Sequence, residues 1–200
     1  MLNKKKLAIE LSKLSSLDNK KINLEQYILD SEIAAELILI INFNNDIKDN
    51  VIADLGCGNG ILGKGCLFFN PEKVYFVDKD KDAIDIVKKN VKDERAVFVN
   101  KDIKDFNKKA DVVIMNPPFG TKVKYADREF LLKAMQISKK IYSLHKITSV
   151  NFIEKIARDN SFKVLDIIRF KLPLRRSYLF HRKEVRNVDV GFWILEKEKI

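Results

Sequence analysis

The chain has 200 residues, a length that suits one domain with a core that needs no disulfides or metals to support it. Hydrophobic residues make up 46% of it, yet no run approaches the 18 apolar residues of a membrane span, so we expect no membrane insertion. The net charge of +10 fits either a solvated lysine-rich surface or a polyanionic partner.

The only two cysteines, Cys57 and Cys66, lack C-x-x-C spacing and have no histidine nearby, so we expect neither a metal site nor a disulfide framework. The first residues lack the apolar run and small-residue cleavage site of a secretion signal. Together these features favour a reducing compartment and a cytoplasmic location.

The first 50 residues favour two helices. Leucines at helical spacing predict an amphipathic helix over 3–17, and a second helix is expected to start at Asp30 or Ser31 and to end in the polar loop 42–50. The leucines of the first helix are Leu7, Leu11, Leu14 and Leu17.

From Val51 onward strands alternate with helices, which predicts an α/β fold whose mostly parallel sheet carries helices on both faces. The strands are expected at 51–55, 73–77, 96–99, 111–115 and 141–145, and a final pair at about 162–171 and 187–196. The helices are expected at 61–69, 80–90, 127–139 and 150–159. We expect a single domain, with N-terminal helices and a lid in 1–46, an α/β core in 47–160 and a basic C-terminal hairpin in 161–200.

A glycine-rich turn follows the first predicted strand, in the segment from Asp54 to Ile61. Its three glycines, Gly56, Gly58 and Gly60, allow positive φ and a close approach of the backbone to a ligand. The helix that starts near Ile61 presents unpaired N–H groups. The turn therefore favours a nucleotide-like ligand, the alternative being an ordinary tight strand–helix connection.

Acidic residues stand where the next two strands end. Asp78 is placed to bind both ribose hydroxyls of an adenosine-containing cofactor, or else to cap the following helix. Asp102 and Ile103 follow the third strand and offer a carboxylate for the adenine amine and an apolar side chain for the ring, or else form a solvated turn. In parallel sheets ligands bind at this end of the strands, so we expect one site.

Asn116, Pro117, Pro118 and Phe119 form the most specific segment. The two prolines fix φ and remove backbone donors, which leaves carbonyls rigidly presented. The Asn116 amide oxygen and such a carbonyl can accept hydrogen bonds from an NH2 group, while Phe119 stacks on a planar ring. This combination fits an amine such as that of adenine; the alternative is a rigid turn with Phe119 in the core.

These segments resemble those of class I S-adenosylmethionine-dependent methyltransferases, which implies a Rossmann-like fold with a seven-stranded sheet and S-adenosylmethionine as cofactor. By this resemblance the four residues 116–119 are catalytic. The cofactor would contact Asp54, Gly56, Gly58, Asn59, Gly60, Ile61, Asp78, Asp102, Ile103 and Asn116.

Further segments, Leu24-Glu-Gln-Tyr27 and Tyr142-Ser-Leu-His-Lys146, resemble the methyltransferase-like protein 5 family. That family makes N6-methyladenosine in small-subunit ribosomal RNA. The resemblance also implies that Gln26 and the backbone near Leu29 close over the cofactor. This chain departs from the family pattern at Ile28-Leu29, where the family has Pro-Thr, so a hydroxyl contact from that position is not expected.

Two clusters of basic and aromatic residues suggest an RNA-binding surface, since cations bind phosphates and aromatic faces stack on bases. The alternative is a solvated hairpin. The residues that we expect to bind RNA are Lys122, Lys124, Arg169, Arg175, Arg176, His181, Arg182 and Lys183.

The third predicted strand contains Ala96, Val97, Phe98 and Val99, which are apolar on both faces. By the family resemblance it lies at a sheet edge, where a small zinc-ribbon methyltransferase-activator subunit adds a strand. The alternative is that Phe98 is buried under a helix and the edge stays open. Any zinc would belong to that partner.

The leading hypothesis is therefore adenine-N6 methylation of small-subunit ribosomal RNA. One rival keeps the chemistry but methylates a glutamine amide of a protein, because Asn-Pro-Pro-aromatic motifs also serve that nucleophile. Another is a non-catalytic RNA-binding assembly factor with the same fold.

Overall fold

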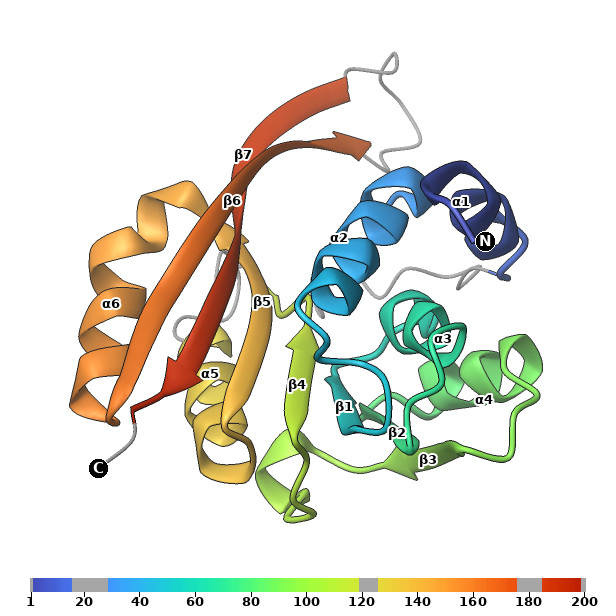
Figure 1. The fold of residues 1–200 in the computed structure, drawn as a ribbon, viewed down its shortest axis with the longest axis horizontal. Coiled ribbons are helices and arrows are strands. Elements are labelled where there is room, and N and C mark those ends of the chain that lie inside the picture. Colours follow the sequence, from blue (N-terminus) through green and yellow to red (C-terminus); the bar gives the residue numbers. More distant parts are fainter. Residues whose placement is uncertain (1, 16–28, 119–125, 176–184, 199–200) are drawn as a thin grey trace.

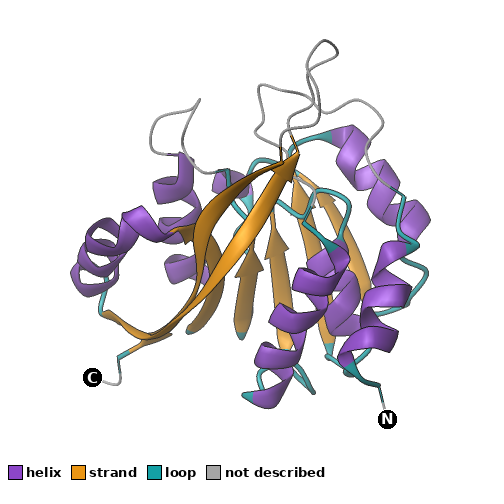
Figure 2. Ribbon diagram, turned by 90° about the horizontal axis from the view of Figure 1, so that it is seen from above, coloured by secondary structure: helices purple, strands orange, loops and turns teal. Residues whose placement is uncertain are grey.

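A computed structural model describes residues 2–15, 29–118, 126–175 and 185–198. A seven-stranded sheet with the strand order β3-β2-β1-β4-β5-β7-β6 forms its centre. Strands β1 to β5 pair in parallel, whereas β7 runs antiparallel to both β5 and β6. Helices cover both faces of the sheet (Figures 1 and 2), which confirms the predicted α/β class and its antiparallel C-terminal hairpin.

Most observed elements lie close to those expected from the sequence, but the first helix, which was expected over 3–17, already ends at Ser12. The strands are β1 (Val51–Leu55), β2 (Lys73–Asp78), β3 (Ala96–Asn100), β4 (Val112–Met115), β5 (Lys140–Lys146), β6 (Phe162–Arg175) and β7 (Val185–Lys197). The α-helices are α1 (Lys4–Ser12), α2 (Ser31–Phe43), α3 (Ile61–Leu67), α4 (Lys81–Asn90), α5 (Ala126–Ile137) and α6 (Val150–Asp159). Two short 3-10 turns, η2 (Ile103–Asp105) and η3 (Ile147–Ser149), complete the described part.

Aspartates set the start of two helices. The Asp30 carboxylate accepts hydrogen bonds from the N–H groups of Glu32 and Ile33 and so caps α2. Asp30 is one of the two residues at which the sequence predicted the start of this helix. Asp80 caps α4 by accepting the N–H of Asp82 at 3.1 Å. The alternative in which Asp78 caps this helix is therefore wrong, because the chain offers a second aspartate two residues later.

Side chains that alternate along the strands divide the core into two clusters. Ile52 and Ile114 pack on one face with helices α1 to α4, and Ala53 and Val113 pack on the other with α5 and α6. All four are fully buried. Among the described residues no helix is long and apolar enough to cross a membrane.

The last two strands are longer than their hydrophobic pattern suggested. Pairing of β5 with β7 stops at Lys146 and Val190, but β6 and β7 remain paired as far as Arg175 and Val185. The two strands therefore continue beyond the sheet as a two-stranded ribbon, which curves away from it in Figure 1.

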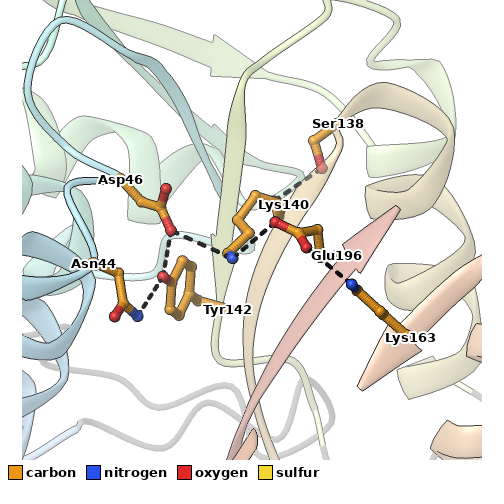
Figure 3. A network of polar contacts seen from close by, with 7 residues as sticks. All are labelled: Asn44, Asp46, Ser138, Lys140, Tyr142, Lys163 and Glu196. Carbon is orange, nitrogen blue, oxygen red and sulfur yellow. Dashed lines mark hydrogen bonds and ion pairs between the residues drawn. The ribbon is translucent and has the colours of Figure 1, made fainter. Parts of the chain in front are cut away.

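A polar network joins the loop after α2 to the sheet near the start of β5 (Figure 3). This end of the sheet is the one opposite the glycine turn. Lys140 Nζ lies 3.8 Å from Asp46 and 3.3 Å from Glu196, and Glu196 also pairs with Lys163. The Tyr142 hydroxyl donates to Asp46, and burial is the main cause that raises the pKa of this phenol. The network therefore joins the loop to β5, β6 and β7.

Candidate active site

The strand register brings three predicted site residues side by side. Leu55, the last residue of β1, pairs with the next-to-last residue of β2 and with the last residue of β4. The residues that come next are Gly56, Asp78 and Asn116. The glycine turn, the ribose acid and the start of the Asn-Pro-Pro segment therefore meet at one edge of the sheet, as expected for a parallel α/β fold.

The glycine turn folds back on β2. The N–H groups of Gly56 and Cys57 both donate to the Val77 carbonyl, at 2.8 and 3.1 Å. Gly56, Gly58 and Gly60 all have positive φ, at 68°, 55° and 81°. A Cβ on Gly58 would meet no atom within 4 Å, so the middle of the turn borders open space that a ligand can fill.

Asp78 ties this turn to the end of β2. Its Oδ2 accepts the Gly58 N–H at 3.0 Å, and its Oδ1 accepts the Asp80 N–H at 2.9 Å. Each carboxylate oxygen keeps a second acceptor position, enough for the two hydroxyls of a ribose. Burial is the largest cause that raises the pKa of Asp78 above its usual range, so a ligand that donates to this carboxylate would satisfy a partly desolvated charge.

Asp54 lies deeper, at the end of β1, with 1% of its surface exposed. Its Oδ2 accepts the Gly63 N–H at 2.9 Å, so it holds the first turn of α3 against the sheet. Burial, with a smaller contribution from Asp78, raises the pKa of Asp54 to about 7. Because Asp54 keeps a proton up to about pH 7, the negative charge beside the turn comes mainly from Asp78, which favours a cationic ligand.

The next predicted residues differ in how accessible they are. Asp102 is half-exposed and caps η2, since its Oδ1 accepts the Lys104 N–H at 3.0 Å. Ile103 is 7% exposed and belongs to the core with Phe106. The proposed adenine contact therefore depends more on Asp102 than on Ile103.

The Asn-Pro-Pro segment leaves β4 at this edge. Asn116 and Pro118 are half-buried, and Pro117 is buried. Leu29, which precedes α2, is 3% exposed, and Arg169 is exposed on β6, opposite Gly191. The predicted residues Gln26, Phe119, Lys122, Lys124, Arg176, His181, Arg182 and Lys183 lie outside the described residues, as does the side chain of Arg175.

The structure adds residues that sequence reasoning missed. His145 near the end of β5 is 1% exposed, and its Nε2 lies 2.7 Å from Ser143 Oγ. Burial lowers the pKa of this imidazole to about 3, so it is neutral at physiological pH. The i, i+2 spacing of the pair places both side chains on one face of a strand and was the available signal. Asn90, at the end of α4, contacts the glycine turn and had no comparable signal.

Comparison with known proteins identifies relatives of the whole chain. The family model of the methyltransferase small domain matches residues 30–141. The zebrafish (Danio rerio) rRNA N6-adenosine-methyltransferase METTL5 is 36% identical, over 94% of this chain and 96% of its own length. An uncharacterised Methanocaldococcus jannaschii protein is 34% identical, over 98% and 95%.

A solved structure agrees with the fold over nearly its full length. It is a Pyrococcus horikoshii protein, provisionally described as an RNA methyltransferase, with 39% identity and a TM-score of 0.91 over 98% of each chain. A match that covers both chains almost completely supports the fold of the whole chain.

Proposed function

The chain belongs to the methyltransferase small-domain family and groups there with the METTL5 rRNA N6-adenosine-methyltransferases, and from this premise we propose that it methylates N6 of an adenosine in small-subunit ribosomal RNA. The observation that carries the proposal is the register that sets Gly56 between Asp78 on one side and Asn116 on the other. A methyl donor held by the turn and an amine held by Asn-Pro-Pro would then be neighbours.

The residues present fit S-adenosylmethionine as the cofactor. Its adenosine part needs a carboxylate for the ribose hydroxyls, which Asp78 supplies, and the negative charge of the same carboxylate suits the positively charged sulfonium and ammonium groups. The space beside Gly58 lets a ligand approach the backbone closely. Asp102 offers an acceptor for the adenine amine.

The bound cofactor supplies an electrophilic methyl group, and the chain's own residues position the amine that attacks it. The N6 lone pair is delocalised into the adenine ring. The Asn116 amide oxygen and the Pro117 carbonyl oxygen accept hydrogen bonds from the two N–H groups of the N6 amine. These hydrogen bonds strengthen as the nitrogen becomes tetrahedral. Phe119 is the residue that we expect to stack on the ring. Positioning is the main contribution, and no strong general base is required.

The RNA would extend from this edge along the basic ribbon. Arg169 and Lys171 are exposed on β6, and Lys171 pairs with Asp189 where the two strands leave the sheet. Arg175, Arg176, His181, Arg182 and Lys183 follow in the sequence, and Lys122 and Lys124 follow the Asn-Pro-Pro segment. Together they would bind phosphates and unstacked bases of a flipped or single-stranded target.

The free edge of β3 suits a partner that adds a strand, for which we propose a small zinc-ribbon activator subunit. Within the described residues β3 pairs only with β2, and Ala96 to Val99 are all half-buried. Phe98 stacks on Phe76 with ring centroids 5.7 Å apart, so its side chain belongs partly to the core. Val97 packs with neither core cluster, and a partner would cover it.

We also propose a location in the cell. The whole chain would act as one methyltransferase domain in the cytoplasm, where the free and buried Cys57 and Cys66 would stay reduced.

The decisive experiment measures methyl transfer from labelled S-adenosylmethionine to small-subunit ribosomal RNA, with the activator subunit present. Wild type and Asn151→Ala, an exposed site on α6, should label the RNA, and Asn116→Ala should reduce the rate at least about 100-fold. Nucleoside analysis should identify N6-methyladenosine. A folded, cofactor-binding wild type that labels a protein instead would support the glutamine-amide alternative. No methyl transfer to either would support the non-catalytic assembly factor.

A further inference from the structure

Asn90 is the last residue of α4, and its side chain joins three separate parts of the chain. Its Nδ2 donates to the Asn59 carbonyl at 3.0 Å and to the Ser15 carbonyl at 3.1 Å. Its Oδ1 accepts the Ser15 N–H at 2.9 Å. One amide group therefore holds the backbone that follows α1 and the backbone of the glycine turn, although these are 75 and 31 residues away in sequence.

These three contacts require the chemistry of an asparagine. Both amide hydrogens are donated and the amide oxygen accepts, so the side chain bonds to the N–H and the carbonyl of Ser15 at the same time. An aspartate of the same shape has no hydrogen to donate and would place a charge against two carbonyls. An alanine would leave all three backbone groups without this partner.

The contact matters because of the residue that it holds. Asn59 lies between Gly58 and Gly60, whose positive φ values give the turn its shape. Inside the turn, Gly58 is held by Asp78 at 3.0 Å, and Gly60 donates to the Cys57 carbonyl at 2.8 Å. On the outer side of the turn, the contact with Asn90 is the hydrogen bond that fixes the Asn59 carbonyl.

We propose that Asn90 is a positioning residue of the cofactor site: by tying Asn59 to Ser15 it fixes the glycine turn in the conformation that binds S-adenosylmethionine. This inference rests on the proposed function. Without the tie, the peptide groups on both sides of Asn59 can reorient, and binding has to order them again. The loss therefore falls on cofactor affinity more than on folding.

Asn160 offers a control at the end of another helix. It directly follows α6, and its Nδ2 donates to the Ile156 carbonyl at 2.8 Å, so it holds only its own helix. Alanine at Asn160 removes one hydrogen bond within a helix, whereas alanine at Asn90 removes three hydrogen bonds to other parts of the chain. Only the change at Asn90 also releases the glycine turn.

The test measures the Kd of S-adenosylhomocysteine by calorimetry and the thermal stability of the ligand-free full chain, for wild type, Asn90→Ala and Asn160→Ala. We expect both variants to remain folded, with the larger loss of stability in Asn90→Ala because it loses three hydrogen bonds rather than one. The Kd should be about tenfold higher in Asn90→Ala and within twofold of wild type in Asn160→Ala. Hydrogen exchange of the Gly60 amide, which donates within the turn, should be faster only in Asn90→Ala.

Asn90→Asp provides a second variant that keeps the size of the side chain, and it should raise the Kd at least as much as alanine does. An Asn90→Ala or Asn90→Asp protein that is folded and binds with wild-type affinity would overturn the inference, and so would equal losses of affinity in Asn90→Ala and Asn160→Ala. A folded wild type that does not bind S-adenosylhomocysteine would instead remove the proposed function on which the inference rests.

Discussion

The Asp78 carboxylate accepts the N–H of Gly58 at 3.0 Å, so the acid that ends β2 and the middle glycine of the turn after β1 form one unit. The same carboxylate is the proposed acceptor for the ribose. A residue that binds the ligand therefore also shapes the loop that surrounds it.

This double role predicts a large effect of Asp78→Ala on cofactor binding. The variant loses the ribose acceptor and releases Gly58, and hydrogen bonds to a charged group contribute about 1.5–3 kcal/mol, so the Kd of S-adenosylhomocysteine should rise about 10–100-fold. Calorimetric titration measures it. Asp85→Asn, an exposed position on α4, is the control and should bind as wild type does. Unchanged affinity in Asp78→Ala would exclude this acid from the site.

Alanine at two glycines of the turn should separate stability from binding. A Cβ on Gly56 would lie 2.9 Å from Phe130 Cε1, whereas one on Gly58 meets no protein atom within 4 Å. Both positions have positive φ, which costs alanine about 1–2 kcal/mol. We expect Gly56→Ala to lower the free energy of unfolding further than Gly58→Ala does, and Gly58→Ala to weaken cofactor binding. Chemical denaturation and calorimetry of both variants test this, and equal unfolding free energies would contradict it.

The pH dependence of stability should contain two opposing contributions. His145, whose folded pKa of about 3 lies below its ordinary 6.5, stays neutral while the unfolded chain takes up a proton, so stability falls as pH drops from 6.5 toward 3. The limit is about 1.4 kcal/mol per pH unit. Asp54, whose folded pKa of about 7 lies above 3.8, keeps a proton that the unfolded chain has lost, so stability falls as pH rises from about 4 to 7.

Denaturation at pH 4.5, 5.5 and 6.5 separates the two contributions. The stability of wild type relative to His145→Gln should decrease at lower pH, and that of wild type relative to Asp54→Asn should increase. Parallel curves for wild type and either variant would show that the replaced group does not titrate in this way.

The edge of β3 gives a prediction about the partner. Val97 is half-buried on an open strand, so Val97→Lys should leave the chain folded, with a stability change within about 1 kcal/mol, and should abolish co-purification with the activator subunit. Leu165→Lys is the control because Leu165 is 44% exposed on β6, the opposite edge strand. If Val97→Lys still co-purifies with the subunit, or if the Leu165 variant also loses it, the partner binds elsewhere.

Much of this architecture could be predicted because its signals are local. Short apolar segments that alternate with helical patterns indicated the strands, and Gly56 and Asn116 stand directly after strands that a parallel sheet must place together. The choice between Asp78 and Asp80 as the cap of α4 needed coordinates, since either aspartate has a suitable side chain.

Other features depend on contacts that no local pattern encodes. Asn90 and Ser15 are far apart in sequence, and no pattern of residues around either of them predicts that they form hydrogen bonds with each other. The final strands were predicted too short because Pro173 and the charges around it resemble a loop. β6 is an edge strand, where a proline need not donate to a neighbouring strand.

The strand order has a consequence for synthesis of the protein. β7 lies between β5 and β6, although it leaves the ribosome after both. Until it emerges, β6 has no neighbour in the sheet and one side of β5 stays open, whereas β1 to β4 can already pair. The nascent chain therefore exposes unpaired strand edges until β7 has emerged, and the insertion of β7, which brings the buried Trp193 between β5 and β6, completes the sheet.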